Sequence, residues 1–274
     1  MYKDFKIVIV TPAGRKRYLE FLIPQILKLR PIVDEYVLFV NTREQEDIQY
    51  MISQEAQYRD FIKLRYLDGP KPHLGAAIAW FLKECIDEKT IYLRLDDDII
   101  YMDHIEYFKE FLDFRIEHPE YFLVYLNVLN NGFISYIHQR LGNIGTKEGI
   151  VKSDASDKVG WDSPTFAKYL HEDILTNGIE KFRFNKPWIL YENELVSVNA
   201  ICWFGSEYAK FNGLVDPNEE LWQSVTKPQQ LKRYNCIYGN CICIHFAFWT
   251  QRKLLDTTDI LEQYRNILPK WNQQ

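Results

Sequence analysis

The chain has 274 residues, of which 47% are hydrophobic and 15% aromatic, so it can build a substantial apolar core. Its formal net charge of −5 argues against a nucleic-acid-binding protein. No apolar stretch reaches the roughly 18 residues of a membrane-spanning helix, so we expect no transmembrane segment, although peripheral contact with a membrane stays open. The five scattered cysteines predict reduced thiols in a cytoplasmic protein.

Strands and helices are expected to alternate through the first half of the chain. Short apolar runs such as KIVIV are typical of buried parallel strands, and the segments between them show helical spacing of apolar residues. We expect strands at 6–10, 36–40, 61–67 and 91–95, and helices at 18–29, 44–55 and 74–85. This alternation predicts an α/β fold with a mainly parallel sheet between helix layers.

The second half of the chain is less regular. Asp103 is expected to cap a helix at 103–117, and Asp216 a helix that opens with Pro217. Glycines and polar residues between 130 and 163 predict a long, partly mobile segment. We further expect strands at 122–128, 195–204 and 241–247, and helices at 164–175, 206–212 and 257–268. A single domain over 1–274 with a C-terminal helical extension fits this order best.

Three carboxylates, Asp96, Asp97 and Asp98, directly follow the apolar strand expected at 91–95. In an extended chain Asp96 and Asp98 point to one side and Asp97 to the other. Two hard oxygen ligands on one side suit Mg²⁺ or Mn²⁺, and such a cation suits a diphosphate. The alternative is a solvated acidic turn, which is the commoner explanation of an isolated Asp-x-Asp.

Other polar residues fall at the carboxyl ends of the expected strands, where ligands of parallel sheets bind. These residues are Thr11, Arg15, Asn41 and Asp68. Their convergence with the aspartates favours a cation site. Arg15 is either a solvated charge beside two basic neighbours or a clamp for phosphate. Cys241, Cys243 and His245 alternate on one strand and could imitate a soft-metal site, but buried alternation is the better explanation.

These residues give the chain a resemblance to nucleotide-sugar glycosyltransferases of the GT-A fold. The resemblance covers most of the chain outside 130–190. It rests on the segments VIVTPAGR, HLGAAIAWFLK and LRLDDDI, on WFG ending at Gly205, on DPNEELW, and on His245 after a late strand.

The resemblance implies a nucleoside-diphosphate sugar as donor and a divalent cation, Mn²⁺ or Mg²⁺. Asp98 would hold the cation, Asp96 would contact the ribose or metal-bound water, and His245 would be a further ligand through neutral imidazole. Residues 1–128 would form the donor half and 129–274 the acceptor half. The implied donor-contacting positions are Thr11, Pro12, Arg15, Asn41, Asp68, His73, Asp96, Asp97 and Gly205.

Glu219 and Glu220 are expected at the start of a helix, where the helix dipole alone favours acidic residues. In inverting enzymes of the resembled family, the second acid of such a pair takes the proton from the acceptor hydroxyl. This implies Glu220 as the base, with Glu219 as the second choice. Both are glutamates, whereas the family's pair often ends in aspartate.

The expected reaction is therefore transfer of a sugar to an acceptor hydroxyl of a glycan or glycoconjugate, with inversion, in polysaccharide or glycoconjugate synthesis. A sugar-1-phosphate nucleotidyltransferase should carry a glycine-rich loop after its first strand, where this chain has only Gly14. A phosphatase that uses an aspartyl phosphate should carry its Asp-x-Asp after the first strand rather than the fourth. A non-catalytic sugar-binding module is the third alternative.

Overall fold

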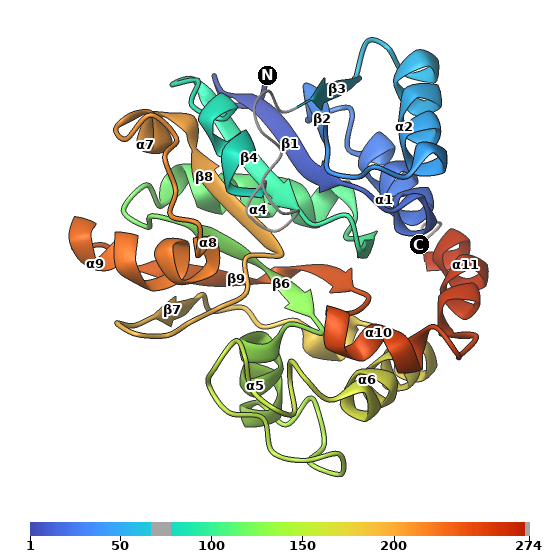
Figure 1. The fold of residues 1–274 in the computed structure, drawn as a ribbon. Coiled ribbons are helices and arrows are strands. Elements are labelled where there is room, and N and C mark those ends of the chain that lie inside the picture. Colours follow the sequence, from blue (N-terminus) through green and yellow to red (C-terminus); the bar gives the residue numbers. More distant parts are fainter. Residues whose placement is uncertain (67–77, 272–274) are drawn as a thin grey trace.

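The computed structural model describes residues 1–66 and 78–271. In the described residues of the first half, the expected alternation of strands and helices is confirmed (Figure 1). Of the helix expected at 74–85, residues 74–77 lie outside the described residues, and Ile78–Glu84 form a 3₁₀ helix. The elements are β1 (Lys6–Ala13), α1 (Lys16–Lys28), β2 (Glu35–Val40), α2 (Gln45–Gln57), β3 (Ile62–Tyr66), the 3₁₀ helix η1 (Ile78–Glu84) and β4 (Thr90–Leu95).

The second half adds shorter elements on the same sheet. They are β5 (Ile99–Met102), α4 (Ile105–Glu117), β6 (Val124–Leu129), α5 (Gly132–Arg140), α6 (Pro164–Asn177), η2 (Glu180–Phe182), β7 (Trp188–Leu190), β8 (Ala200–Phe204), α7 (Gly205–Ala209), α8 (Glu219–Leu221), the π-helical turn η3 (Trp222–Thr226), α9 (Lys227–Leu231), β9 (Asn235–His245), α10 (Trp249–Leu255) and α11 (Ile260–Trp271).

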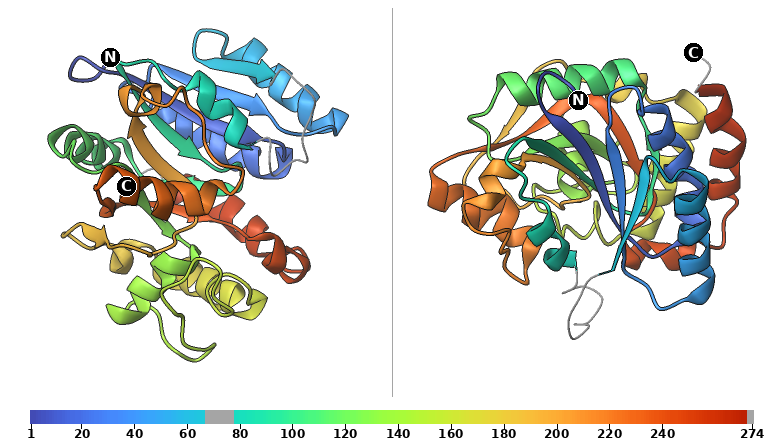
Figure 2. Two further views of the ribbon diagram at one scale, coloured as in Figure 1. Left: turned by 60° about the vertical axis from the view of Figure 1, so that its left-hand side comes forward. Right: turned by 90° about the horizontal axis from the view of Figure 1, so that it is seen from above.

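The described strands form a single mixed sheet in the order β3-β2-β1-β4-β8-β6-β9-β5, with β7 paired to β9. β3, β2, β1 and β4 are parallel, and β8 enters antiparallel between β4 and β6. Helices lie on both sides of the sheet (Figure 2), so the predicted α/β class is confirmed. Because β8 runs against β4, the carboxyl end of β4 and the start of β8 meet at the same edge.

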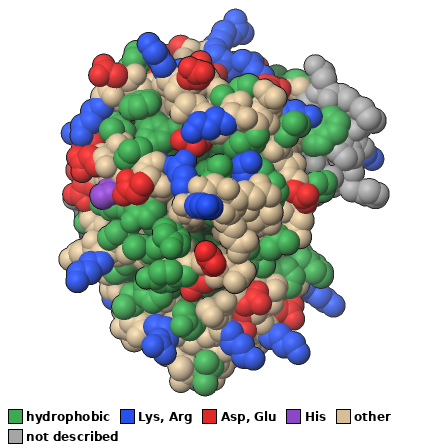
Figure 3. Space-filling view, turned by 90° about the vertical axis from the view of Figure 1, so that its left-hand side faces the viewer, with side chains coloured by type: hydrophobic (Ala, Val, Ile, Leu, Met, Phe, Trp, Pro, Cys, Tyr) green, Lys and Arg blue, Asp and Glu red, His purple; other side chains and the backbone are tan. Residues whose placement is uncertain are grey.

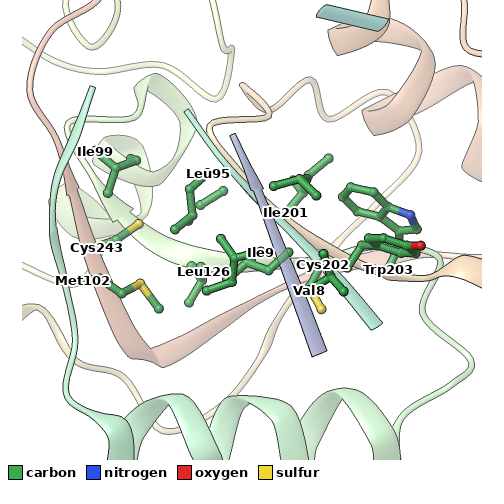
Figure 4. Packing of buried hydrophobic residues seen from close by; sticks show 14 of the residues in the cluster. Val8, Ile9, Leu95, Ile99, Met102, Leu126, Ile201, Cys202, Trp203 and Cys243 are labelled. Carbon is green, nitrogen blue, oxygen red and sulfur yellow. The ribbon is translucent and has the colours of Figure 1, made fainter. Parts of the chain in front are cut away.

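The core lies on both faces of the central strands. Figure 4 shows Val8 and Ile9 of β1 among the buried side chains of β4, β6 and β8. Trp203 is fully buried, stacks on Tyr92 with ring centroids 5.7 Å apart, and donates its indole N–H to the Cys85 carbonyl at 3.3 Å. Trp203 is therefore a core residue. All five cysteines are free and buried, as expected.

Asp103 does not cap a helix, contrary to the sequence-based expectation. Helix α4 begins at Ile105, with His104 at the N-cap. The Asp103 carboxylate is instead fully buried and accepts hydrogen bonds from Arg183 Nη2 at 3.1 Å and from the Ile242 amide at 3.0 Å. It ties the start of α4 to the middle of β9.

Residues 130–163 contain ordered structure where a long, partly mobile segment was expected. The Asn131 side chain accepts the Ile134 amide and caps α5. Gln139 then donates to the Gly149 carbonyl at 2.9 Å and accepts the Val151 amide at 2.8 Å. These side chains satisfy backbone groups that the glycine-rich sequence would otherwise leave to water, so the segment is compact.

Several boundaries differ from the expected ones, and a local cap or strand pairing accounts for two of them. Asn218, not Asp216, caps α8, and its side chain accepts the Leu221 amide. β9 begins at Asn235 because it pairs with both β6 and β7. The expected C-terminal helix is preceded by a separate helix, α10.

No described helix has the length and apolar character needed to cross a membrane. On the described part of the face shown in Figure 3, basic and acidic side chains are interspersed with hydrophobic ones. This face therefore carries no broad region of one charge.

Asp103→Ala is expected to lower the free energy of unfolding by about 1–3 kcal/mol, because it leaves the buried Ile242 amide without its acceptor and leaves Arg183 with Glu180 as its remaining ion-pair partner. Urea unfolding measures this loss. Glu172→Ala, which breaks the exposed pair between Lys168 and Glu172, is the matched control and should cost less than about 1 kcal/mol. Equal losses in both variants would contradict the structural role of Asp103.

Candidate functional site

The three aspartates lie in a turn, not in an extended strand. The Ile99 amide donates to the Asp96 carbonyl at 3.1 Å and closes this turn between β4 and β5. The expectation that Asp96 and Asp98 share one side, with Asp97 opposite, was therefore wrong. Each carboxylate instead meets partners from different elements.

Asp96 faces the amino-terminal end of β8. Its Oδ2 accepts the Asn199 side-chain amide at 3.0 Å, and its Oδ1 accepts Arg94 Nε at 3.0 Å. Its side chain keeps 20% exposure, against 6% for Asp97 and 3% for Asp98. Asp96 is thus the carboxylate of the three that a ligand reaches most readily.

Asp97 organises the turn between β1 and α1. Its carboxylate accepts the Gly14 amide at 2.8 Å and Arg15 Nε at 3.0 Å. A Cβ on Gly14 would lie 2.8 Å from the Asn41 carbonyl, so a side chain does not fit there. Asp97 therefore positions Arg15 and the turn.

Asp98 is surrounded by nitrogen atoms. Its Oδ2 lies 3.0 Å from Arg15 Nη2, 3.1 Å from Arg252 Nη2 and 3.4 Å from His245 Nε2. Burial alone would raise the pKa of Asp98, but the Arg15 guanidinium, aided by His245 and Arg252, outweighs burial and holds that pKa well below its usual range. Asp98 is therefore ionised although it is buried.

His245 has the geometry of a metal ligand. Its Nδ1 lies 3.0 Å from the Asn130 carbonyl, which can only accept, so Nδ1 carries a proton and Nε2 is the nitrogen that would bind a cation. Nε2 faces Asp98. Two adjacent ligands of an octahedral cation, each at about 2.1 Å, lie about 3 Å apart, close to the observed separation.

The two candidate ligands, Asp98 and His245, suit a cation that takes its remaining ligands from water or substrate. No group of three or more His, Cys, Asp or Glu side chains converges within residues 1–66 and 78–271. Mg²⁺ commonly takes one or two protein carboxylates and fills its remaining positions with water and substrate phosphates. The pair of Asp98 and His245 fits that pattern.

A pocket of about 760 Å³ opens over this turn at the carboxyl edge of β1 and β4. Seven of the residues selected from the sequence line this pocket. These are Pro12, Arg15, Asn41, Asp96, Asp97, Asp98 and His245. The structure adds residues that the sequence analysis did not select, namely Gly14, Thr42, Arg43, Glu44, Asn199, Ala247, Phe248, Trp249 and Arg252.

Two of the residues expected to contact a donor lie away from the pocket. Thr11 is fully buried, and its hydroxyl accepts a hydrogen bond from Tyr36 at 3.2 Å. Gly205 follows Phe204, which pairs with Ile91 at the opposite end of β4, and a Cβ there would lie 2.0 Å from the Asp87 carbonyl. The expectation that Thr11 and Gly205 contact a donor was therefore wrong, because neither residue lines the pocket. Asp68 and His73 lie outside the described residues.

Arg94 joins the acidic pair to the aspartates. It is a fully buried arginine on β4 and binds Glu219 through Nη1 at 2.9 Å and Asp96 through Nη2 at 2.9 Å. Burial raises the pKa of Glu219, and Arg94 counteracts this by favouring the carboxylate. The Glu219 carboxylate is therefore held in an ion pair with Arg94.

Glu220 is the less constrained member of the pair. Burial is the main cause that raises its pKa, and the negative charge of Asp96 raises it further against the opposing effect of Ser197. A carboxylate that is destabilised in this way takes up a proton more readily. The pKa of Glu219 is raised as well, so the two residues differ in geometry: Glu219 is paired with Arg94, whereas no ion pair of Glu220 occurs among the described residues. Glu220 is therefore the better candidate for a general base.

Sequence signals existed for some of the missed residues. Arg94 is a charge inside an otherwise apolar strand, and such a charge is stable only with a partner. Asn199 is a polar residue within the strand expected at 195–204. Arg252 is one of several basic residues near the C-terminus, and only the tertiary structure shows that it reaches Asp98.

No protein-family model and no curated protein sequence matches this chain. Among solved structures, a mannosyltransferase from Pyrobaculum calidifontis, in complex with GDP-mannose and Mn²⁺, aligns with a TM-score of 0.52 and 10% identity. The alignment covers 90% of this chain and 58% of that one. This similarity shows that the two proteins share a fold.

Two more distant structures align over nearly the whole chain. The 4-diphosphocytidyl-2C-methyl-D-erythritol synthase of Anaerococcus prevotii has a TM-score of 0.46 and 12% identity, over 97% of this chain and 99% of that chain. The mannose-1-phosphate geranyltransferase of Thermus thermophilus has a TM-score of 0.37 and 13% identity, over 96% and 68%.

Glu220→Gln is expected to stabilise the protein at neutral pH. A glutamate whose pKa is raised by folding contributes stability below its unfolded pKa and loses it as the pH rises through its folded pKa. The free energies of unfolding of variant and wild type should therefore agree near pH 4 and diverge, with the variant more stable, towards pH 8. Urea unfolding across this range tests it, with the exposed Glu106→Gln as the charge control.

Proposed function

We propose that this protein is a metal-dependent glycosyltransferase that moves a sugar from a nucleoside-diphosphate sugar to an acceptor hydroxyl of a glycan or glycoconjugate. One observation carries the proposal. Asp96 lines the pocket that contains Asp98 and His245, and Arg94 pairs at 2.9 Å both with Asp96 and with Glu219, the neighbour of Glu220. Arg94 therefore connects the pocket with the proposed cation ligands to the segment that carries the candidate base.

Asp98 and His245 are the residues that would hold Mn²⁺ or Mg²⁺. When bound, the cation neutralises charge on the leaving diphosphate. The N–H groups of Arg15 and Arg252, which line the same pocket, offer charge-assisted hydrogen bonds to phosphate oxygens. Asp96, the most exposed of the three aspartates, would accept a hydrogen bond from the ribose or from metal-bound water.

Glu220 is the proposed general base. It would remove the proton from the acceptor hydroxyl as that oxygen attacks the anomeric carbon from the face opposite the diphosphate, which inverts the configuration. Glu219 would support this reaction indirectly, because it holds Arg94 and through Arg94 the position of Asp96.

The proposed donor pocket draws on both halves of the chain. Arg15 and Asn41 come from the first half, whereas Asn199, His245 and Arg252 come from the second. We therefore extend the donor site beyond residues 1–128. The acceptor is proposed to bind on the side of Glu220, within 129–274.

Glycosyl transfer accounts for the turn after β1 better than nucleotidyl transfer does. A nucleotidyltransferase needs free backbone amides there to hold phosphate, but the Gly14 amide donates to Asp97. A non-catalytic sugar-binding module would need neither the cation pair nor a carboxylate with a raised pKa. Hydrolysis of a nucleotide sugar in the presence of Mn²⁺ would distinguish the enzyme from such a module.

Asp98→Asn is expected to remove the effect of Mn²⁺ on nucleotide binding while preserving the fold. A thermal-shift screen of UDP-, GDP- and dTDP-sugars, with and without Mn²⁺, first identifies the donor, because a ligand that binds only the folded state raises the melting temperature. Calorimetric titration of the matching nucleoside diphosphate should then show Mn²⁺-dependent affinity in wild type and none in the variant. A variant that keeps metal-dependent affinity would exclude Asp98 as a ligand.

Glu220→Gln should reduce transfer by about 10²–10⁴-fold, the usual contribution of a positioned base, and leave donor affinity near that of wild type. Product formation and nucleotide titration are measured on the same preparation. Glu219→Gln is the neighbouring comparison and should lose less activity. If Glu219→Gln is the inactive variant, the base has been assigned to the wrong residue of the pair, and if both remain active, the reaction proceeds without this base.

A further inference from the structure

Asp98 is the proposed metal ligand, yet in the structure two guanidinium groups already occupy its surroundings. Arg15 reaches it from the turn after β1, and Arg252 reaches it from α10, on the opposite side of the pocket. The two arginines balance the charges of Asp97 and Asp98. A divalent cation added to this group would face two positive neighbours.

The two arginines also have unused hydrogen-bond donors. Within the described part of the chain, Arg15 Nη1 and Arg252 Nε are shielded from solvent and have no hydrogen-bond acceptor. A buried donor without an acceptor is costly and therefore uncommon in native proteins. Both residues line the pocket, with side chains about 30% exposed, so an anion in the pocket can approach them.

We propose that Arg252 and Arg15 make cation binding depend on the diphosphate: they pair with Asp98 and oppose a divalent cation until a diphosphate binds and draws their guanidinium groups away. This inference rests on the proposed function. Its physical basis is that the diphosphate supplies the negative charge that the added cation requires and the acceptors that the two guanidinium groups lack. Cation and nucleotide then bind together far more tightly than the cation binds alone.

The proposed opposition to cation binding is tested at Arg252. It lies on the short helix α10, and its partner across the pocket is Asp98, whereas Arg15 also holds Asp97 and the β1–α1 turn. Arg252→Met keeps an unbranched apolar side chain and removes the charge. Arg17→Met is the matched control, because Arg17 pairs with Asp256 at 3.0 Å and does not contact Asp98.

The experiment is calorimetric titration of the full chain, first with Mn²⁺ alone and then with UDP, GDP or dTDP at saturating Mn²⁺. We expect Arg252→Met to bind Mn²⁺ alone at least about 10-fold more tightly than wild type, and to bind the nucleotide at least about 10-fold more weakly, the size expected for a lost charge-assisted hydrogen bond. Arg17→Met should resemble wild type in both titrations. Thermal melting of each variant confirms that it is folded.

Three outcomes would overturn the inference: equal Mn²⁺ affinity in wild type and Arg252→Met, unchanged nucleotide affinity in Arg252→Met, or the same changes in Arg17→Met. The titration with Mn²⁺ alone does not depend on the nucleotide. If wild type binds none of the three nucleotides with Mn²⁺, the proposed function fails, while the gain in Mn²⁺ affinity still shows whether Arg252 opposes the cation.

Discussion

Three consecutive carboxylates at the end of a buried strand are the constraint on which this structure depends. Asp97 and Asp98 are almost fully buried, and charges in such positions are stable only when they are paired and hydrogen-bonded. The partners of the three aspartates come from several parts of the chain. Asp96 pairs with Arg94 and Asn199, Asp97 pairs with the turn after β1, and Asp98 pairs with Arg15 of that turn and with residues from β9 and α10. The turn thus joins the two halves of the molecule.

Sheet topology brings these partners together. β1 and β4 are parallel neighbours, so the turn after β1 and the turn after β4 lie at one edge. β8 is antiparallel to β4, which places Asn199 opposite the end of β4 and sends Gly205 to the other edge. β9 returns beside β5 and places His245 against Ile99. A site of this composition needs the mixed sheet, since an all-parallel order would not bring the start of a strand to this edge.

Buried Arg94 links structure to the proposed chemistry. It spans Asp96, beside the proposed cation site, and Glu219, next to the proposed base. Because a buried guanidinium makes several directed hydrogen bonds, it fixes the positions of both carboxylates. In the proposed reaction, Arg94 would thereby fix the distance between the donor site and the acceptor site. Glu220, which does not pair with Arg94, would exchange the proton.

The sequence alone determined the fold class and part of the site. Apolar runs and helical spacing indicated the alternation of β1 to β4 with helices, because these local patterns reflect which side chains a strand or helix must bury. The convergence of Arg15, Asn41 and the aspartates followed from the rule that parallel strands end at one edge. The expectations for Asp103 and Gly205 were mistaken because hydrogen bonds and strand order over long sequence separations decided their positions. The ordered turns of 130–163 were missed because they depend on hydrogen bonds from side chains to the backbone within that segment, such as the bond from Gln139 to Gly149. Only the tertiary structure revealed that Arg252 reaches Asp98, since a residue's partner 154 positions away leaves no local pattern in the sequence.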